Sequence, residues 1–322
     1  MTIFFLKQNK FIASDIRTKD GQTARDQQVK GNPNDPEISN GERRKNRDQQ
    51  VEEELNVPLK TSEERQIVRK QHLQEYCRNH DYNKSPGADD VHFLAVDDDL
   101  KLIYCVVPKV GTSTWKTVIA KARKIQRRIS RWGMWRRLSN YTEEEMNERL
   151  KTYFKFVFVR EPLQRLLSAY KHKFIQTPSY TSKLRKEIVQ ALRPQDVEPN
   201  GENFVKFKEF IQYLSNNMSR NQHWRQYGKL CHPCVIHYDF IGHTETLKED
   251  AALLLKMAGI DDRVTFPPIH NSTGPSEVLE YYSQVPPWYI KQLGEQYRND
   301  FEMFGYEYLG PVKKLLDQYT KV

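Results

Sequence analysis

The clearest pattern along the chain is a short apolar run that changes, after a polar turn, into helical spacing. The apolar, β-branched run from Ile103 to Val107 predicts a buried strand. Pro108 ends this run, because proline has no N–H to give to a strand ladder. Apolar residues from Trp115 to Ile125 then recur at helical spacing, after three hydroxyl residues at 112–114 that suit a helix N-cap. The sequence therefore predicts a strand, a tight turn and a helix in succession.

The same succession occurs a second time. Residues Tyr153 to Val159 are mostly apolar and predict another strand, and the helix that follows carries apolar residues from Leu163 to Tyr170. Pro162 suits the first turn of that helix. Two such units imply a parallel sheet with right-handed crossovers and ligands at the carboxyl ends of the strands. We therefore expect an α/β fold, with a central parallel sheet flanked by helices and both turns at one edge of the sheet.

The other segments are assigned from the same periodicities. The patterns predict strands at 93–96 and 235–240, with a turn at 97–99 after the first of these. They also predict helices at 61–78, 204–218, 246–258 and 286–304 and a polar connection at 176–203. Residues 1–60 are too polar to bury a core, so we expect a disordered stem there. The predicted organisation is a stem at 1–60, a helix and loop at 61–90, the main domain at 91–310 and a tail at 311–322.

The first turn has the properties of an anion site. Gly111 gives the backbone freedom to turn, and the helix N-terminus that follows offers free N–H groups and a positive dipole end. Lys109 adds a full positive charge, so we interpret residues 108–114 as a phosphate-binding turn. A Walker A loop needs a lysine after its second glycine, whereas here the lysine precedes the single glycine of the turn. A nucleotide kinase is therefore disfavoured.

Composition and charge agree with an anionic ligand without identifying it. The 322 residues carry a net charge of +9 and are 38% hydrophobic and 29% charged, which is typical of a globular protein and favours an anionic partner. Nine basic residues and no acids lie between positions 116 and 137, beside Trp132 and Trp135. Three explanations stay open for this basic stretch, namely nucleic acid, a long sulfated or carboxylated sugar, and a solvated basic face.

The four cysteines favour an oxidising compartment. Cys231 and Cys234 have the spacing of a zinc or redox pair, but no second pair supplies further zinc ligands. We expect a disulfide that involves Cys231 or Cys234, with buried thiols as the alternative. Cys105, in the middle of a predicted strand, is interpreted as an inert core residue.

The sequence contains no candidate membrane span. The apolar run from Ile3 to Leu6 is far shorter than the roughly 20 residues that a span needs, and it lacks the features of a signal peptide. Taken literally, this pattern predicts a soluble, untargeted chain.

Several motifs in order along the chain resemble one enzyme family. Residues 104–116 (YCVVPKVGTSTWK) resemble the 5′-phosphosulfate loop of Golgi carbohydrate sulfotransferases, and residues 158–170 (FVREPLQRLLSAY) resemble their 3′-phosphate motif. The segments at 223–225, 230–234, 238–247 and 301–306 are similar to the chondroitin and dermatan 4-O-sulfotransferase branch. The resemblance extends from about Gln71 to Tyr306. One departure is that the family often has Ala-Gly-Cys-Ser-Asn at the position of residues 110–114.

The resemblance implies a sulfotransferase-type, P-loop-like fold and the donor 3′-phosphoadenosine 5′-phosphosulfate, without a metal. Lys109 would neutralise charge on the 5′-phosphate and the bridging oxygen, Arg160 would bind the 3′-phosphate, and Ser168 would add a hydroxyl. The full set of expected donor-binding residues is Pro108, Lys109, Val110, Gly111, Thr112, Ser113, Thr114, Arg160, Glu161, Pro162, Leu163, Gln164, Arg165, Leu166, Leu167 and Ser168.

The resemblance also implies an in-line transfer assisted by Lys109 and by a general base. His223 is the first candidate for that base because it lies in a motif-matched loop. His243 and Glu245 are the alternatives, and His172 is discounted because the family usually has other residues there.

The implied acceptor is an acidic glycan or glycosaminoglycan, with the 4-position of N-acetylgalactosamine in chondroitin or dermatan chains as the expected target and no nucleic acid partner. The family resides in the Golgi with a membrane anchor, and sequons at Asn140, Asn217 and Asn271 would fit luminal glycosylation. A catalytically inactive relative that binds polyanions is the competing hypothesis.

Overall fold

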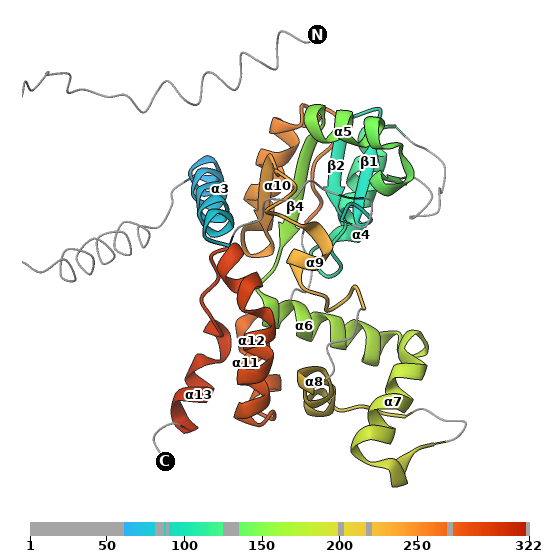
Figure 1. Cartoon of the computed structure of the whole chain (residues 1–322), viewed down its shortest axis with the longest axis vertical. Helices are drawn as coiled ribbons and strands as arrows, with labels where there is room; N and C mark the ends of the chain where they lie inside the picture. The colour runs from blue at the N-terminus through green and yellow to red at the C-terminus, as the bar shows by residue number, and fades with distance from the viewer. Residues whose placement is uncertain are drawn as a thin grey trace, which may run out of the picture. The chain divides into compact units, whose positions relative to one another are not determined.

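Five strands form one mixed sheet in the order β3-β1-β2-β4-β5. Figure 1 labels three of them, β1, β2 and β4. The computed structural model describes residues 61–80, 87, 90–124, 135–198, 203–216, 221–268 and 273–319. The predicted stem, most of the loop before residue 90, the centre of the basic stretch at 125–134, and the sequons at Asn217 and Asn271 lie outside these residues. The strands are β1 (Leu94–Asp97), β2 (Leu102–Cys105), β3 (Arg136–Arg137), β4 (Phe154–Val159) and β5 (Phe240–His243).

The predicted α/β class is confirmed, with an antiparallel edge added to the parallel sheet. Strands β2, β4 and β5 run parallel, whereas β1 is antiparallel to both β2 and β3. The antiparallel pairing of β1 and β2 follows from the acidic turn at 97–99, which reverses the chain between them; the Asp97 carboxylate accepts the N–H of Leu100 at 3.0 Å. The two turns of the strand–turn–helix units follow β2 and β4, which are neighbours in the sheet.

Helices flank the sheet and also build a second apolar core. Their bounds are α3 Ser62–Asn79, α4 Thr112–Ala122, α5 Glu143–Thr152, α6 Pro162–Tyr170, α7 Ser182–Leu192, α8 Phe207–Asn216, α9 Tyr227–Cys231, α10 Leu247–Met257, α11 Pro275–Tyr282, α12 Pro287–Met303 and α13 Lys313–Tyr319. One core surrounds the sheet strands together with α4 and α10. The other joins α6, α8, α11 and α12. Among the described residues, no helix combines the length and apolar character needed to cross a membrane.

Three element predictions were wrong in detail. The third strand begins only at Phe240, because residues 232–236 form a turn in which the N–H groups of Val235 and Ile236 donate to the carbonyl of His232. The polar connection at 176–203 contains α7, whose Ile188 and Val189 are buried. Helix α8 starts at Phe207, and Phe204 lies outside it with 56% of its surface exposed.

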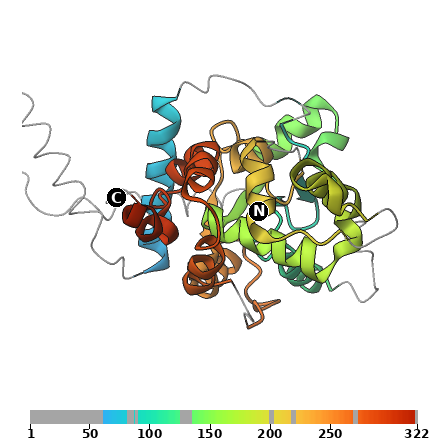
Figure 2. The same cartoon turned by 90° about the horizontal axis from the view of Figure 1, so that it is seen from below.

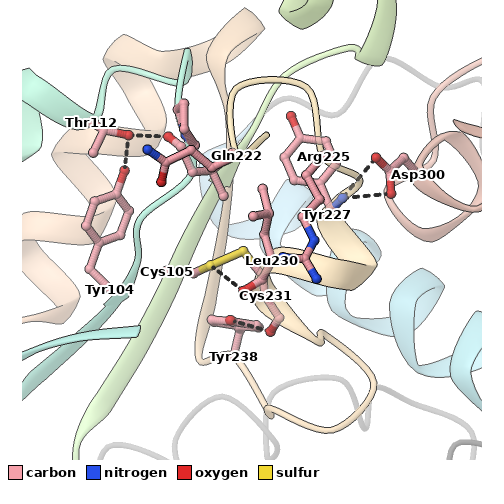
Figure 3. The surroundings of a disulfide bond; sticks show 12 residues. Tyr104, Cys105, Thr112, Gln222, Arg225, Tyr227, Leu230, Cys231, Tyr238 and Asp300 are labelled. Atoms are coloured by element: carbon pink, nitrogen blue, oxygen red, sulfur yellow. Dashed lines mark hydrogen bonds between the residues drawn. A yellow bond between two sulfur atoms is a disulfide. The ribbon is translucent and has the colours of Figure 1, made fainter. Parts of the chain in front are cut away.

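Both cysteines of the 231–234 segment form disulfides, each with a different partner. Cys234 is bonded to Cys77 at the end of α3, and Cys231 is bonded to Cys105 in β2 (Figure 3). The expected disulfide is therefore confirmed. Cys105 lies in the core as interpreted, but it is bonded to Cys231 instead of being a free buried thiol. Because all four cysteines are oxidised in pairs, none is a thiolate ligand for zinc.

Helix α3 closes the edge of the sheet at β5. Its Gln66 side chain donates to the carbonyl of Ile241 at 2.8 Å and accepts the N–H of Ile241 at 3.0 Å, as a neighbouring strand would do. Arg69 binds the fully buried Asp250 of α10 at 2.6 Å. Figures 1 and 2 show this helix, in blue, beside the red α12, and the two helices are in contact. A reciprocal pair of hydrogen bonds between Thr61 and Glu64 caps the start of this helix.

Candidate functional site

The turn between β2 and α4 leaves a helix N-terminus open. Lys109 and Gly111 both have left-handed backbone conformations, with φ of 78° and 83°. Gly111 rather than a hydroxyl residue is the N-cap, and no side chain caps the helix. Among the described residues, the N–H groups of Gly111, Thr112 and Ser113 have no hydrogen-bond acceptor, and the first turn of α4 contains no acid. This end of α4 therefore presents unused donors and a positive dipole end.

The other residues of this turn hold its shape. Val110 is fully buried. The Thr112 hydroxyl donates to the Val107 carbonyl and lies 3.1 Å from the Tyr104 hydroxyl (Figure 3). Ser113 is exposed. Of the three hydroxyl residues at the start of the helix, Thr112 and Thr114 are partly exposed and Ser113 is exposed, and the Thr112 hydroxyl braces the turn against the strand.

The turn between β4 and α6 has its backbone donors already satisfied. The Glu161 carboxylate caps α6 by accepting the N–H groups of Leu163 at 3.2 Å and Gln164 at 2.6 Å. The N–H of Glu161 donates to Glu245 at 3.0 Å, and the N–H of Arg160 donates to the Tyr227 hydroxyl at 2.8 Å. Burial is the main cause that raises the pKa of Glu161 to about 7. The N-terminus of α6 is therefore occupied by the protein itself.

The Arg160 side chain is the group in this second turn that can receive an anion. It is 6% exposed and donates through Nη2 to the carbonyl of Thr273 at 2.5 Å. Its Nε is buried and has no partner among the described residues. Burial lowers the pKa of the guanidinium, although Glu245 and Tyr227 act against this shift. A buried cation with an unused donor is the arrangement that a phosphate would complete.

The remaining predicted residues of α6 are mainly scaffold. Leu163, Leu166 and Leu167 are buried in the second core, with Pro162 and Gln164 also buried and Ser168 partly exposed. Arg165 lies over the Tyr227 ring and donates to three backbone carbonyls, those of Pro108, Gln222 and Arg225. It thereby ties the first turn to the loop that carries His223.

Sequence reasoning missed a group of cations that follows α6. The helix continues as a π-helix over Lys171–Gln176. Lys171 and Lys173, together with Arg160, surround Lys109 closely enough to affect its ionisation. Burial first, and then Arg160, Lys173 and Lys171, lower the pKa of Lys109 to about 8. The signal in the sequence is the basic triplet 171–173 after the second helix, and the π-helix, a feature frequent at functional sites, sets its orientation.

The structure places His223 among the same cations. Burial lowers its pKa to about 3, and Lys173, Lys109, His172 and Arg165 contribute further. Asn221 Oδ1 accepts the backbone N–H of His223 at 3.0 Å and lies 2.8 Å from its Nδ1. Since that oxygen is an acceptor, Nδ1 is assigned as the protonated nitrogen, which leaves the lone pair on Nε2.

The two alternative bases have other surroundings. His243 is partly buried and stacks on Tyr306 with ring centroids 4.9 Å apart. Burial, together with Arg69, Arg65 and His72, lowers its pKa well below the usual range. Glu245 accepts hydrogen bonds from the Glu161 N–H and the Tyr306 hydroxyl. The discounted His172 does belong with the cations, because Lys109 and Lys173 add to the burial that lowers its pKa.

The site as a whole brings together unused backbone N–H groups, several cations and a neutral imidazole. It combines free helix amides, a lysine and a buried arginine on neighbouring parallel strands, which suits a ligand with two separate phosphate groups. Within the residues that the structure describes, no group of three His, Cys, Asp or Glu side chains is placed to hold a metal ion.

Comparisons with known proteins agree with this geometry. The sequence model of the sulfotransferase family matches residues 92–307. Carbohydrate sulfotransferase 11 of Rattus norvegicus is 35% identical over 246 residues, which cover 68% of this chain and 68% of that protein. Carbohydrate sulfotransferase 14 of Danio rerio is 39% identical over 242 residues (71% and 65%), and carbohydrate sulfotransferase 10 of Homo sapiens is 34% identical over 244 residues (66% and 67%). No solved structure gives a significant match.

Proposed function

The chain belongs to the sulfotransferase family and is a carbohydrate O-sulfotransferase that uses 3′-phosphoadenosine 5′-phosphosulfate, and from this premise we propose its acceptor and the roles of its residues. The acceptor is an acidic glycan, and the target is the 4-hydroxyl of N-acetylgalactosamine in chondroitin- or dermatan-type chains. When bound, the donor supplies the sulfuryl group. The competing hypothesis of an inactive polyanion-binding relative is set aside, because the unused donors described above fit a nucleotide with two phosphates.

The open turn is proposed to hold the 5′ end of the donor. The amides of Gly111, Thr112 and Ser113 have no other acceptor among the described residues, so an anion there gains their hydrogen bonds without displacing existing ones. Lys109 contributes a charge that is already destabilised by burial and by three neighbouring cations. An anionic group that develops charge beside Lys109 relieves this repulsion, which is how a preorganised cation stabilises a transition state.

The filled turn is proposed to recognise the 3′-phosphate through a side chain. Arg160 keeps its Nε free while its backbone is held on both sides by Tyr227, which accepts from the N–H and donates to the carbonyl, each at 2.8 Å. A guanidinium fixed in this way loses little conformational freedom when it binds a phosphate. The 3′-phosphate is therefore assigned to Arg160, and the amides of α6 take no part in its binding.

His223 is proposed as the general base. A histidine with a pKa near 3 is neutral at pH 7 and can accept a proton, but it is a weak base. Its low pKa is caused partly by Lys109 and Lys173. Phosphates bound beside those lysines would offset their charge, so His223 becomes more basic when the donor site is filled. This coupling would keep proton abstraction in step with donor binding.

A luminal location in the Golgi is proposed together with this activity. The two disulfides are the observation that supports it, because disulfides persist in oxidising compartments. The sequon residue Asn140 is exposed, as a glycosylation site must be.

The acceptor assignment is tested by product analysis. The purified chain is incubated with the donor and unsulfated chondroitin or dermatan, and the disaccharides released by lyase digestion are separated and identified. Sulfate at the 4-position of N-acetylgalactosamine is expected. Sulfate at the 6-position alone would overturn the proposed position, and absence of transfer to any acidic glycan would overturn the proposed acceptor class.

The role of His223 is tested separately from donor binding. For His223→Ala we expect kcat to fall by about 10² to 10⁴, the range for loss of a general base, with unchanged affinity for 3′-phosphoadenosine 5′-phosphate. Tyr180→Phe removes a hydroxyl 3.5 Å from His223 Nδ1 and is the matched control that keeps the base. Full activity of His223→Ala would exclude the proposed role.

A further inference from the structure

A pocket with a volume of about 500 Å³ lies between α3 and the segment at 233–241. Side chains between Lys70 and Arg78 of α3 form one wall, and the turn before β5 forms the other together with Ile241 of β5. The volume lies within the range of about 300 to 1,000 Å³ that is usual for sites that bind small ligands. The pocket is therefore large enough to hold a ligand of that size.

The two walls of this pocket are fixed to each other. The disulfide between Cys77 and Cys234, both of which line the pocket, joins α3 covalently to the opposite wall. About one helical turn before Lys70, the Gln66 side chain exchanges two hydrogen bonds with the backbone of Ile241. The pocket is thus formed before a ligand arrives, and binding does not have to order its walls.

The charged side chains that line the pocket are basic. Lys70 and Arg78 come from α3 and His237 from the opposite wall, and none of the described lining residues is acidic. The Lys70 ammonium donates to the backbone carbonyl of Asp239 at 3.4 Å, whereas the carboxylate of Asp239 is paired with Lys155 of β4 at 3.0 Å. The pocket therefore favours an anionic ligand.

The arrangement of the two α3 cations suits a linear ligand. Lys70 and Arg78 are eight positions apart, which separates their Cα atoms by roughly 12 Å along the helix axis. Leu73 lies between them on the same wall, and Pro233 and Tyr238 supply apolar surface opposite. Two separated cations with apolar surface between them match a chain that carries acidic groups at intervals, with ring faces between these groups. An acidic glycan has this chemistry, whereas a small anion would engage only one of the two cations.

The pocket lies away from the donor site. Tyr238 precedes β5, at the amino end of that strand, whereas the open and filled turns follow the carboxyl ends of β2 and β4, which run parallel to β5. Figure 3 shows Tyr238 on the opposite side of the Cys105–Cys231 disulfide from Thr112 of the open turn. The lining includes none of the residues that we assign to the donor or to the base. A ligand that occupies both the pocket and the reacting site must therefore be an extended chain.

We propose that this pocket binds a segment of the acidic glycan at a distance from the sugar that receives the sulfate. The proposal rests on the proposed function and adds a second binding site for the same polymer. Lys70 and Arg78 pair with acidic groups of separate sugars, and Leu73 and Tyr238 contact the rings between them. When the pocket holds one part of the chain, the reacting sugar is presented at a high effective concentration, so a long chain binds more tightly than a short one.

The test compares a long and a short acceptor in matched variants of the full chain. The long acceptor is unsulfated chondroitin, and the short one is a chondroitin tetrasaccharide, which is expected to occupy the reacting site alone; concentrations are expressed per disaccharide. Lys70→Gln and Arg78→Gln each remove one pocket cation, and a double variant removes both. Lys248→Gln removes an equal charge from an exposed position of α10 that does not line the pocket. KM, kcat and the Kd of 3′-phosphoadenosine 5′-phosphate are measured for each protein.

For the polymer we expect KM to rise about two- to fivefold in each single variant and about tenfold in the double variant, as for the loss of partly exposed ion pairs, with kcat and donor affinity unchanged. For the tetrasaccharide, KM should match the wild type in every variant, which also shows that the variants are folded. An equal rise of KM for both acceptors, an equal effect of Lys248→Gln, or an unchanged KM for the polymer in the double variant would overturn the inference. Absence of both transfer and donor binding in the wild type would instead overturn the proposed function.

Discussion

The two strand–turn–helix units share one secondary-structure pattern and differ in what occupies the helix N-terminus. After β2, the amides at 111–113 have no acceptor among the described residues, and Gly111 caps α4 without a side chain. After β4, the Glu161 carboxylate occupies the same position in α6, and Tyr227 and Glu245 accept the preceding amides. One turn is therefore open to an anion, whereas the other has been filled by the protein.

This difference shows that a helix N-terminus becomes an anion site only where the chain leaves its amides unused. In the open turn, the backbone and Lys109 are available together. In the filled turn, binding must come from a side chain, and the buried Arg160 is positioned to provide it. The two phosphates of one donor would then be bound by different chemistry, by backbone amides at one end and by a guanidinium at the other.

Among substitutions that compare the two turns, the largest effect on activity should come from the open turn. Lys109→Ala removes the cation beside the free amides, and we expect kcat/KM to fall by about 10² to 10³, comparable to the loss of a transition-state donor. Initial rates with a fixed acceptor and varied donor measure this change. Lys121→Ala, on the exposed face of the same helix, is the control and should retain full activity. Equal losses in both variants would indicate a general charge effect.

The filled turn should discriminate between nucleotides. Arg160→Ala should weaken binding of 3′-phosphoadenosine 5′-phosphate by about 10- to 100-fold, the value of a charged hydrogen bond, and should leave binding of adenosine 5′-phosphate unchanged because that ligand has no 3′-phosphate. Lys109→Ala should weaken binding of both nucleotides. Calorimetric titration of each variant with each nucleotide gives the four affinities. The division of roles fails if Arg160→Ala weakens both ligands alike.

The pH dependence of donor binding should report on Lys109. Its pKa of about 8 in the free protein means that the side chain loses its charge as the pH rises through 8, whereas bound phosphates favour the charged form and raise this pKa. The affinity for 3′-phosphoadenosine 5′-phosphate should therefore fall about tenfold between pH 7 and pH 9. Lys109→Arg keeps its charge across this range and should flatten the profile. A flat profile in the wild type would contradict the assigned pKa.

The smallest expected effects are on the free energy of unfolding. They should distinguish the N-terminus of α6, which a carboxylate caps, from that of α4, which no side chain caps. Glu161→Ala removes the acceptor of two amides and should lower the free energy of unfolding by about 1 kcal/mol, as for loss of an N-cap. Ser113→Ala, at the exposed start of α4, should leave stability unchanged and weaken nucleotide binding a few-fold. Urea unfolding measures the first quantity and calorimetry the second. A loss of stability in Ser113→Ala would mean that the open turn is capped after all.

The sequence was sufficient to predict both turns and to place them at one edge of a parallel sheet, because hydrophobic runs and proline positions are local signals. It could not separate the open turn from the filled one. The groups that fill the second turn, Tyr227 and Glu245, are 67 and 84 positions away from the amides that they accept. Within the motif at 158–170, the sequence does not tell whether Glu161 caps the helix or binds a ligand.

Other features depended on contacts that no local pattern encodes. The disulfide partner of Cys105 lies 126 positions away, and the strand environment alone favoured a buried thiol. Lys171 and Lys173 approach Lys109 because the helix widens into a π-helix, which side-chain periodicity does not reveal. Arg165 was predicted as a donor ligand, yet its guanidinium is used by three backbone carbonyls. These residues acquire their roles from the packed fold.

The central claim is that one ligand spans the open and the filled turn. Its most direct test is a calorimetric titration of the wild-type chain with 3′-phosphoadenosine 5′-phosphate and with adenosine 5′-phosphate. We predict one binding site per chain and an affinity about 10- to 100-fold higher for the ligand that carries the 3′-phosphate. Equal affinity for the two nucleotides, or no binding of either, would contradict the account.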